Sequence, residues 1–313
     1  MTDQFLISAI VKTLAFFDLF SFPLTAVEIW RYLYSDRKYS LEEVIAVLPQ
    51  ITLVGQSQGY YFLSSRDDKI VTLRKERYGI AEKKYRKVKK VCRFLAFLPF
   101  VRMIAVCNTL AYSNAADGSD IDLFIITRSK KAWTTRFFCL FFLKFFGLRP
   151  KENDVKDKFC LSFFVDEESM NLEKTALPRN DIYLCYWIDQ LFPVYDADGC
   201  YYKKFQERNV WIKKYLANSI GVDPNLRRTI VLGSVGGFMK KSKEYFWQSD
   251  KMERWAQKMQ WYRLPQLLKE KFKNKYVGVA IEEGLIKLIS NDRREGYRNE
   301  WIIKVNELVT KLK

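Results

Sequence analysis

The sequence of 313 residues contains no histidine, and this absence removes several classes of chemistry. Ser-His-Asp and Cys-His catalysis both need an imidazole as general base, and many metal sites need one as a ligand. Acid–base or metal chemistry in this chain would fall to carboxylates, lysine, tyrosine or cysteine. Carboxylate oxygens favour Mg²⁺ or Mn²⁺ over softer metals.

Paired cysteines and long hydrophobic runs are also absent. The six cysteines are scattered without a Cys-x-x-Cys pair, which argues against a zinc ribbon or a disulfide framework and fits a reducing cytoplasm. Residues 1–20 lack the basic start and the cleavage site of a secretory signal. The most apolar window, 132–147, contains Arg136 and Lys144 and is too short to span a bilayer. We expect a cytoplasmic protein in which this window is a buried or interfacial helix, with membrane contact as the less favoured alternative.

Positive charge is in excess, because 53 Lys and Arg side chains accompany 36 Asp and Glu, a formal net charge of +17. Such an excess suits a polyanionic partner: nucleic acid, a nucleotide or an anionic membrane surface. A composition that is simply rich in lysine would give the same excess without any such partner. The length allows two or three domains, and the apolar content of 49% predicts a folded chain.

The chain is predicted to begin with three helices. Residues 4–18 have apolar residues at helical spacing. Two capping boxes, in which a Ser or Thr precedes a Glu by three residues, then mark two helix starts. They are Thr25 with Glu28 and Ser40 with Glu43.

A β-hairpin is predicted next, from apolar runs at 51–54 and 60–65 that are split by the polar turn 55–59. Three helices and a hairpin within residues 1–66 predict a winged helix-turn-helix domain. Such domains often read DNA through Arg, Lys, Asn or Gln near the start of one helix. No basic residue lies between 40 and 50. We therefore favour a structural or protein-binding role over sequence reading.

Residues 67–98 form a long helical pattern rich in Lys and Arg. The commoner explanation is an amphipathic helix with a solvated basic face. The same face could attract phosphate or an RNA backbone, and the two interpretations are compatible.

After Pro99 the apolar pattern changes to that of an α/β core. Strands are predicted at 101–107, 119–127 and 158–165, with an apolar helix at 130–146 before the last of them. Strands that alternate with helices predict a small mixed sheet.

The fold class expected is thus α/β (α+β), with three domains. The winged helix occupies 1–66, the core 67–178 and a mostly helical region 179–313. In the last region, helices are predicted at 181–196 and 201–216. A short strand is predicted at 276–281, and the Gly-Ser stretch 233–237 is expected to be a flexible connection.

Two aspartates stand at the start of the second predicted strand. Because side chains alternate along a strand, Asp120 and Asp122 face the same side, with Cα atoms about 7 Å apart. Two carboxylates on one face can hold one or two divalent ions that clamp a triphosphate. Upstream, the first strand ends in a turn that opens a helix, where Asn108 and Thr109 could offer backbone N–H groups and a hydroxyl to phosphate oxygens.

The stretch from Asn108 to Ile126 resembles the signature of the DNA polymerase β-like nucleotidyltransferase superfamily: a Gly-Ser pair, about a dozen residues, then Asp-x-Asp between hydrophobic residues. The resemblance covers 101–127. It implies that Asp120 and Asp122 bind Mg²⁺ (or Mn²⁺), that Asn108 and Thr109 contact the phosphates of an NTP, and that Ser119 lies at the rim of the site.

Two departures from the pattern stand out. Asn108 replaces glycine, although Asn is among the residues that best tolerate a left-handed backbone. The family usually carries a third carboxylate on the next strand, where this chain offers Cys160 and Ser162 in one register or Phe159 and Leu161 in the other. Three options remain: Asp166 substitutes as the catalytic base, the substrate supplies its own base, or the site is inactive.

Two further groups have a structural and a functional interpretation. Residues 291–296 gather acidic residues and two arginines, which suits a capped helix start but also a contact to a triphosphate tail or an acidic acceptor. Tyr183, Tyr186 and Trp187 recur at helical spacing, which is typical of core, although a base could stack on one of them.

The function expected from these residues is Mg²⁺-dependent transfer of a nucleoside monophosphate from an NTP to a hydroxyl acceptor. The acceptor could be a small molecule, a protein side chain or an RNA end. The alternative is a catalytically inactive module of the same fold that binds nucleic acid or a protein partner through its basic faces.

Overall fold

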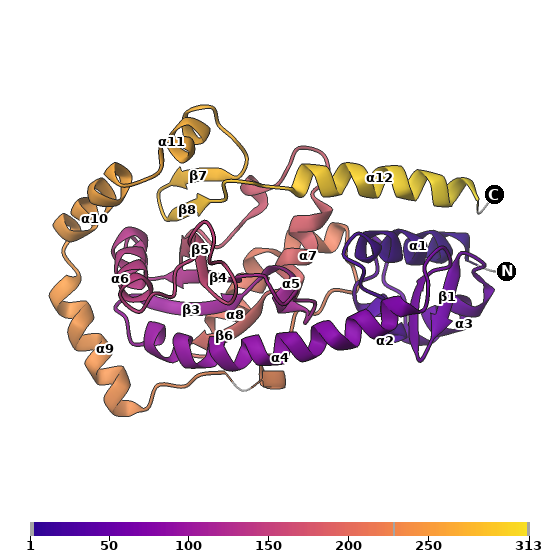
Figure 1. Ribbon diagram of the computed structural model, residues 1–313, viewed down its shortest axis with the longest axis horizontal. Coiled ribbons are helices and arrows are strands. Elements are labelled where there is room, and N and C mark those ends of the chain that lie inside the picture. The colour runs from indigo at the N-terminus through magenta and orange to yellow at the C-terminus, as the bar shows by residue number, and fades with distance from the viewer. Residues whose placement is uncertain (1–2, 228, 312–313) are drawn as a thin grey trace.

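One mixed β-sheet organises the structure, a computed structural model that describes residues 3–227 and 229–311 (Figure 1). Its six strands lie in the order β6-β3-β4-β5-β8-β7, and only β4 and β5 are parallel neighbours. The bounds are Val101–Val106 (β3), Ile121–Thr127 (β4), Phe159–Asp166 (β5), Phe192–Asp196 (β6), Val279–Glu282 (β7) and Leu285–Leu288 (β8). The expected mixed α/β class is confirmed.

Strands from the last part of the chain complete this sheet. β6, β7 and β8 all lie beyond residue 178, so the sheet extends past the boundary we expected there. The helix predicted at 181–196 ends at Gln190, and its remainder is strand β6. That part of the prediction is wrong because pairing with β3 overrides helical spacing. Pro193, which has no N–H to donate, is tolerated because β6 is an edge strand.

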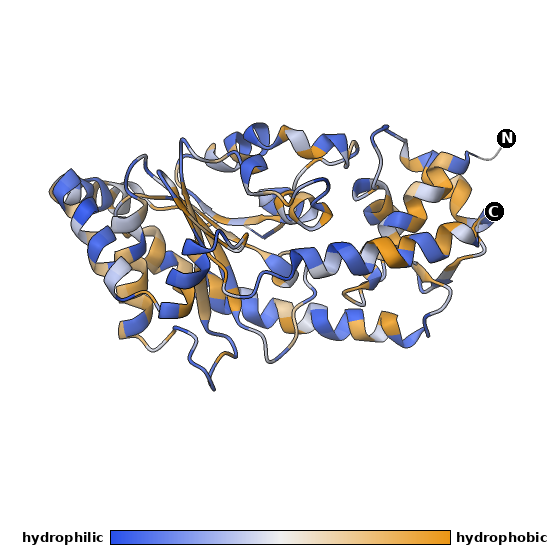
Figure 2. Cartoon of the chain, turned by 90° about the horizontal axis from the view of Figure 1, so that it is seen from above, coloured by the Kyte–Doolittle hydropathy of each residue, from blue (hydrophilic) through white to orange (hydrophobic). Residues whose placement is uncertain are grey.

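Helices cover both faces of the sheet (Figures 1 and 2). The long helices are α1 (Gln4–Asp18), α4 (Lys69–Ala96), α6 (Ala132–Phe145), α7 (Ile182–Gln190), α8 (Tyr201–Arg208), α9 (Ser234–Trp247), α10 (Asp250–Tyr262), α11 (Gln266–Lys273) and α12 (Arg294–Thr310). Shorter ones are α2 (Ala26–Arg31), α3 (Leu41–Val47) and α5 (Asn108–Ala111).

Alternation along the strands feeds two hydrophobic cores. Phe124 and Phe163 belong to the core that includes α1, α7 and α8. Leu123 and Phe164 belong to the core that includes α4, α6 and α10. The first core runs without a break from the N-terminal helices into the sheet, which fixes the N-terminal unit against the face that bears the candidate site.

The N-terminal unit has the predicted order of elements. Both capping boxes are present: Thr25 with Glu28 begins α2, and Ser40 with Glu43 begins α3. Strands β1 (Val54–Ser57) and β2 (Tyr60–Leu63) form the antiparallel hairpin. Its turn is shorter than expected, because Gln58 has a φ of 52° and Gly59 a φ of 81°, as a tight hairpin turn requires.

The stretch 233–237, which we expected to be a flexible connection, begins helix α9 instead. Tertiary contacts outweigh the low helix propensity of its glycines. Glu244 of α9 forms an ion pair with Arg102 and accepts a hydrogen bond from the backbone N–H of Phe100. Lys240 is buried and donates to the carbonyl of Val101.

The two ends of the chain lie at the same end of the molecule (Figure 1). Helix α12 packs on α1, where the indole of Trp301 donates to the carbonyl of Lys12 at 2.9 Å. In the part of the chain that the structure describes, no helix combines the length and apolar character needed to cross a bilayer.

Candidate functional site

Asp120 and Asp122 lie on one face at the start of β4, as predicted. Asp120 directly precedes the strand, and Asp122 is its second residue. Three ligand atoms lie within 4.8 Å of one another: a carboxylate oxygen of Asp120, a carboxylate oxygen of Asp122 and the sulfur of Cys160. All three residues are partly exposed. The strand period and the parallel pairing of β4 with β5 thus assemble a cluster at one end of the sheet.

The environment of the two carboxylates favours their protonated forms. Burial, and then the charge of Asp120, raise the pKa of Asp122 to about 6, although hydrogen bonds from Asn108 and Cys160 oppose the shift. Burial also raises the pKa of Asp120. Two close carboxylates that cannot both ionise at low cost are a recurrent feature of sites that bind cations or transfer protons.

Asn108 forms the left-handed turn that was expected where the family pattern has glycine. Its φ is 58°, and the backbone N–H of the preceding Cys107 donates to the carbonyl of Asp122 at 3.2 Å, which fixes the turn beside the acid pair. Its Nδ2 donates to Oδ2 of Asp122 at 2.7 Å. Its Oδ1 accepts from the indole of Trp187 at 3.0 Å and from the hydroxyl of Tyr183 at 3.3 Å.

This double role of Asn108 predicts different effects for two substitutions. Asn108→Ala should lower the free energy of unfolding by about 3 kcal/mol, because it combines the strain of a left-handed alanine, about 1–2 kcal/mol, with the loss of a hydrogen bond to a carboxylate. Asn108→Gly keeps the turn relaxed and should cost about half as much. Urea unfolding of both variants would show the difference, and equal losses would contradict the backbone part of the argument.

The strand opposite the acid pair presents Cys160 and Ser162, the first of the two registers that the sequence left open. Asp122 is the register partner of Cys160, and the register then shifts before Phe124 pairs with Phe163. The position where the family pattern has a third carboxylate is therefore a thiol and a hydroxyl in this chain. Burial raises the pKa of Cys160 to about 12, so this sulfur is a neutral thiol at physiological pH.

Asp166 does not join the acid pair. It is the last residue of β5 and pairs with Thr127 at the opposite end of β4 from Asp122. Its carboxylate is buried and accepts hydrogen bonds from the backbone N–H groups of Lys130, Glu168 and Ser169. These bonds organise the loops at that end of the sheet.

The other two predicted site residues have different positions. Thr109 lies in the first turn of α5, partly buried, and its carbonyl accepts from the N–H of Asn114 at 2.8 Å. The hydroxyl of Ser119 donates back to the carbonyl of Ala116 at 2.9 Å, so this side chain closes a turn. Among the described residues, the hydroxyl of Thr109 has no hydrogen-bond partner, so it is open to a ligand. The hydroxyl of Ser119 is already occupied.

Lys84 anchors the loop that leads into the acid pair. It belongs to the basic helix α4, but only 3% of it is exposed. Its Nζ donates to the carbonyls of Asp117 and Ser119 at 3.1 and 2.7 Å and pairs with Asp157 at 2.7 Å. No local signal indicates this burial, because Lys84 stands in a run of similar lysines on a helix whose basic face was predicted to be solvated.

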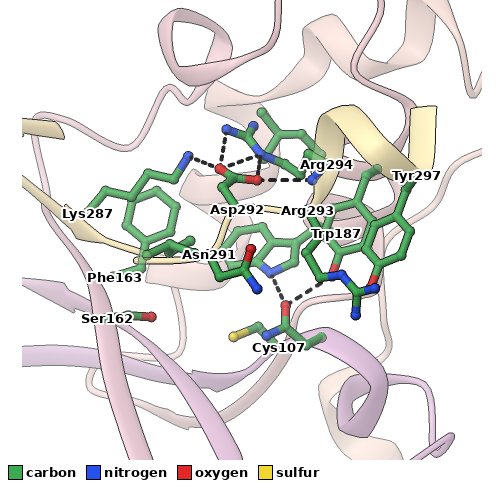
Figure 3. Close-up of a pocket in the computed structure, with 14 residues that line it drawn as sticks. Cys107, Ser162, Phe163, Trp187, Lys287, Asn291, Asp292, Arg293, Arg294 and Tyr297 are labelled. Carbon is green, nitrogen blue, oxygen red and sulfur yellow. Dashed lines mark hydrogen bonds and ion pairs between the residues drawn. The ribbon is translucent and has the colours of Figure 1, made fainter. Parts of the chain in front are cut away.

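A cavity of about 210 Å³ opens beside Asn108, between the sheet and helices α7 and α12. Its walls are aromatic. Trp187 and Phe163 stack with ring centroids 5.6 Å apart (Figure 3), and Tyr183 and Tyr297 stack at 5.4 Å. Ser162 also lines the cavity.

One end of the cavity carries buried charge. Lys287, Asp292 and Arg294 cluster there (Figure 3), and Arg294 reaches on to Asp181 at 2.6 Å. Burial lowers the pKa of Lys287 to about 8. The structural interpretation of 291–296 is seen directly, because Asp292 accepts from the N–H of Arg294 at the start of α12. The same residues line the cavity, and their contact to a triphosphate tail stays a prediction.

Among the aromatic candidates, Tyr183 and Trp187 line the cavity, whereas Tyr186 is buried core and donates its hydroxyl to the carbonyl of Tyr32. Sequence reasoning missed Phe163, Lys287 and Tyr297. No local signal could have found them, because they come together only when β5, β8 and α12 assemble.

Comparisons with protein-family models, with curated proteins and with solved structures found no significant match to this chain.

Proposed function

We propose that this chain is a metal-dependent nucleotidyltransferase that moves a nucleoside monophosphate from an NTP to a hydroxyl acceptor. One observation carries the proposal: Asp120 and Asp122 share a face beside the left-handed turn at Asn108, and the side chain of Asn108 both bonds Asp122 and lines the aromatic cavity. The metal ion, the phosphates and the base of an NTP would then bind to neighbouring groups: the acid pair, the turn and the cavity. The resemblance of residues 101–127 to the DNA polymerase β-like superfamily points to the same chemistry.

The acid pair fits Mg²⁺ or Mn²⁺. Its two carboxylates supply hard oxygen ligands. Their pKa values are raised by burial and, at Asp122, also by the charge of Asp120, and a cation would offset both effects. A bound ion would stabilise negative charge on the transferred phosphate. Cys160 is a poor ligand for Mg²⁺, so solvent or substrate oxygens would complete the coordination.

The remaining roles follow from the neighbours of the pair. Thr109 and the N–H groups that follow Asn108 would bind phosphate oxygens. They belong to the first turn of α5, which begins at Asn108, the residue that donates a hydrogen bond to Asp122. The cavity between Trp187 and Tyr297 would take a flat ring, by stacking. We assign Asp166 no role in activating the acceptor. Its carboxylate accepts hydrogen bonds from three backbone N–H groups at the other end of the sheet.

We further propose that the N-terminal unit is a winged helix-turn-helix that binds protein or stabilises the fold rather than reading DNA. Helix α3 begins with exposed Glu42 and Glu43, which would repel a phosphate backbone. A cytoplasmic location fits six cysteines that are all unpaired.

The test is release of pyrophosphate from each of the four NTPs with Mg²⁺ or Mn²⁺ present. Asp120→Ala should lower turnover by at least about 10²-fold, the usual cost of losing an electrostatic group that acts at the transition state. Asp117→Ala is the matched control, because Asp117 lies in the same loop but pairs on the surface with Lys156. Equal turnover in the Asp120 and Asp117 variants would contradict the proposal.

A second candidate function is an inactive module of this fold, and the observation that favours it is Cys160 in place of a third carboxylate. This alternative predicts nucleic-acid binding that weakens steeply with salt, is unchanged by Asp120→Ala and occurs without nucleotide turnover.

A further inference from the structure

Helices α6, α9 and α10 lie at the end of the molecule remote from both termini (Figure 1), and a continuous row of aromatic rings connects them. We call it the aromatic ridge. Its members touch one another in sequence through ring contacts, from α4 across α6 to α9 and α10. They are Phe94, Phe137, Phe138, Phe141, Phe142, Phe145, Phe146, Trp247 and Trp255.

Phe137 and Phe142 pack against the core beneath the ridge, but most of its rings are open to solvent. Six of its rings, those of Phe94, Phe141, Phe145, Phe146, Trp247 and Trp255, are between 41% and 74% exposed. Helix α6 already buries its other side through residues such as Cys139 and Leu143. Neighbouring α9 adds three more exposed rings, Phe238, Tyr245 and Phe246. Contiguous apolar surface of this kind marks a site of interaction.

Each part of the ridge has an exposed lysine one helical turn away. Residues three or four apart on a helix are neighbours on its surface. Lys90 therefore flanks Phe94, Lys144 flanks Phe141, Lys243 flanks Trp247 and Lys251 flanks Trp255.

Carboxylates on the elements of the ridge are few, and each is paired or hydrogen-bonded. The segments 86–97, 132–151 and 235–263 contain three carboxylates. Glu244 pairs with Arg102 and Asp250 pairs with Lys131. Glu253 accepts hydrogen bonds from the first backbone N–H groups of α6. The surface is therefore apolar in its centre and basic at its margin.

We propose that the aromatic ridge and its lysines form a docking surface for an anionic lipid bilayer. Phenylalanine rings would enter the boundary between headgroups and acyl chains while the lysines contact anionic headgroups. Helix α6 lies on the bilayer and does not cross it, since its 14 residues span about 21 Å against a hydrocarbon core of about 30 Å. The proposal thus favours the alternative that the sequence ranked below a buried or interfacial helix without membrane contact.

The charge and packing of the ridge argue against the other occupants. A second copy docked symmetrically would bring two basic margins together, at a cost in repulsion. Single-stranded nucleic acid needs separate rings with open faces. Here ridge rings cover one another: Phe94 and Phe142 stack at 5.7 Å, and Phe141 and Phe145 at 6.3 Å.

The experiment is co-sedimentation of the full chain with phosphatidylcholine vesicles, with and without about one third phosphatidylserine. Binding should need the anionic lipid and weaken as salt is raised. The double variant Phe145→Ser, Phe146→Ser should bind at least about tenfold more weakly. Phe5→Ser is the matched control, because Phe5 is 70% exposed and belongs to α1, the helix at the opposite end of the molecule (Figure 1). This variant should bind as the unchanged chain does.

A second readout needs no substitution, so it remains decisive if the double variant fails to fold. Brominated acyl chains in the anionic vesicles should quench part of the tryptophan fluorescence, since Trp247 and Trp255 belong to the ridge. The proposal is overturned if neither readout detects the anionic vesicles. It is also overturned if the double variant loses only self-association or only binding to single-stranded oligonucleotides while vesicle binding is unchanged.

Discussion

Asp122→Asn is expected to stabilise the metal-free protein at pH 7.5 and to weaken binding of Mn²⁺ or Mg²⁺ by at least about tenfold. Burial and the charge of Asp120 raise the pKa of Asp122 to about 6, so its ionised form is a cost to the folded state at neutral pH. Asparagine removes that charge, keeps the shape and can still accept from Nδ2 of Asn108. The gain should be about 1–2 kcal/mol after allowance for partial exposure.

The gain should depend on pH in a defined direction. The unfolded chain releases the proton of Asp122 near its ordinary value of 3.8, whereas the folded chain keeps it up to about pH 6. The folded state therefore binds more protons between these values, and the native protein loses stability as pH rises through that window. The advantage of the variant is absent below about pH 4 and complete above about pH 6.

Urea unfolding at a series of pH values, with and without Mn²⁺, measures both effects. Mn²⁺ should stabilise the native protein in proportion to its binding and should stabilise Asp122→Asn far less. The control is Asp117→Asn, which removes an exposed carboxylate from the same loop. An Asp122 variant that is less stable than the native chain at pH 7.5 would show that the carboxylate is a structural group and not part of a cation site.

Arg294→Met is expected to lower the free energy of unfolding by about 3 kcal/mol. Arg294 lies between two buried carboxylates, with its guanidinium 2.6 Å from Asp181 and 2.9 Å from Asp292. Removing one partner of a buried ion pair leaves the remaining charge unpaired, which costs several kcal/mol. Lys287 still pairs with Asp292 and limits the loss, while Asp181 is left with backbone N–H donors.

The loss of stability in Arg294→Met should become smaller as the pH falls. Burial raises the pKa of Asp292, but the hydrogen bonds and charge of Arg294 outweigh burial and hold it below its ordinary value. Stability from such a carboxylate is present above the unfolded pKa of 3.8 and disappears as pH falls through the folded value. The free energies of unfolding of the native protein and the variant should therefore converge in acid, as Asp292 becomes protonated.

Arg298→Met is the matched control for Arg294, because Arg298 lies four residues later on α12 and pairs only with the exposed Glu295 and a carbonyl. Arg298→Met should lower the free energy of unfolding by less than about 1 kcal/mol. Denaturant unfolding of both variants makes the comparison. Equal losses would indicate that the buried cluster at the end of the cavity contributes no more than a surface pair does.

Local signals in the sequence determined much of the framework. Apolar spacing and Asp3, whose side chain caps the first helix, define α1, and two capping boxes start α2 and α3. The period of two along 121–127 was enough to put Asp120 and Asp122 on one face. These features depend on residues within one or two turns of each other, so the local chain carries the information.

Tertiary structure decided which residues accompany that pair. The parallel pairing of β4 with β5 selected Cys160 and carried Asp166 to the far end of the sheet. Assembly buried Lys84 beneath the loop before the pair and turned part of a predicted helix into β6. Such outcomes depend on strand register and on which distant helix covers a face. Register and helix cover are fixed by burial and hydrogen bonding between segments far apart in the chain. Such long-range contacts leave no local pattern in the sequence.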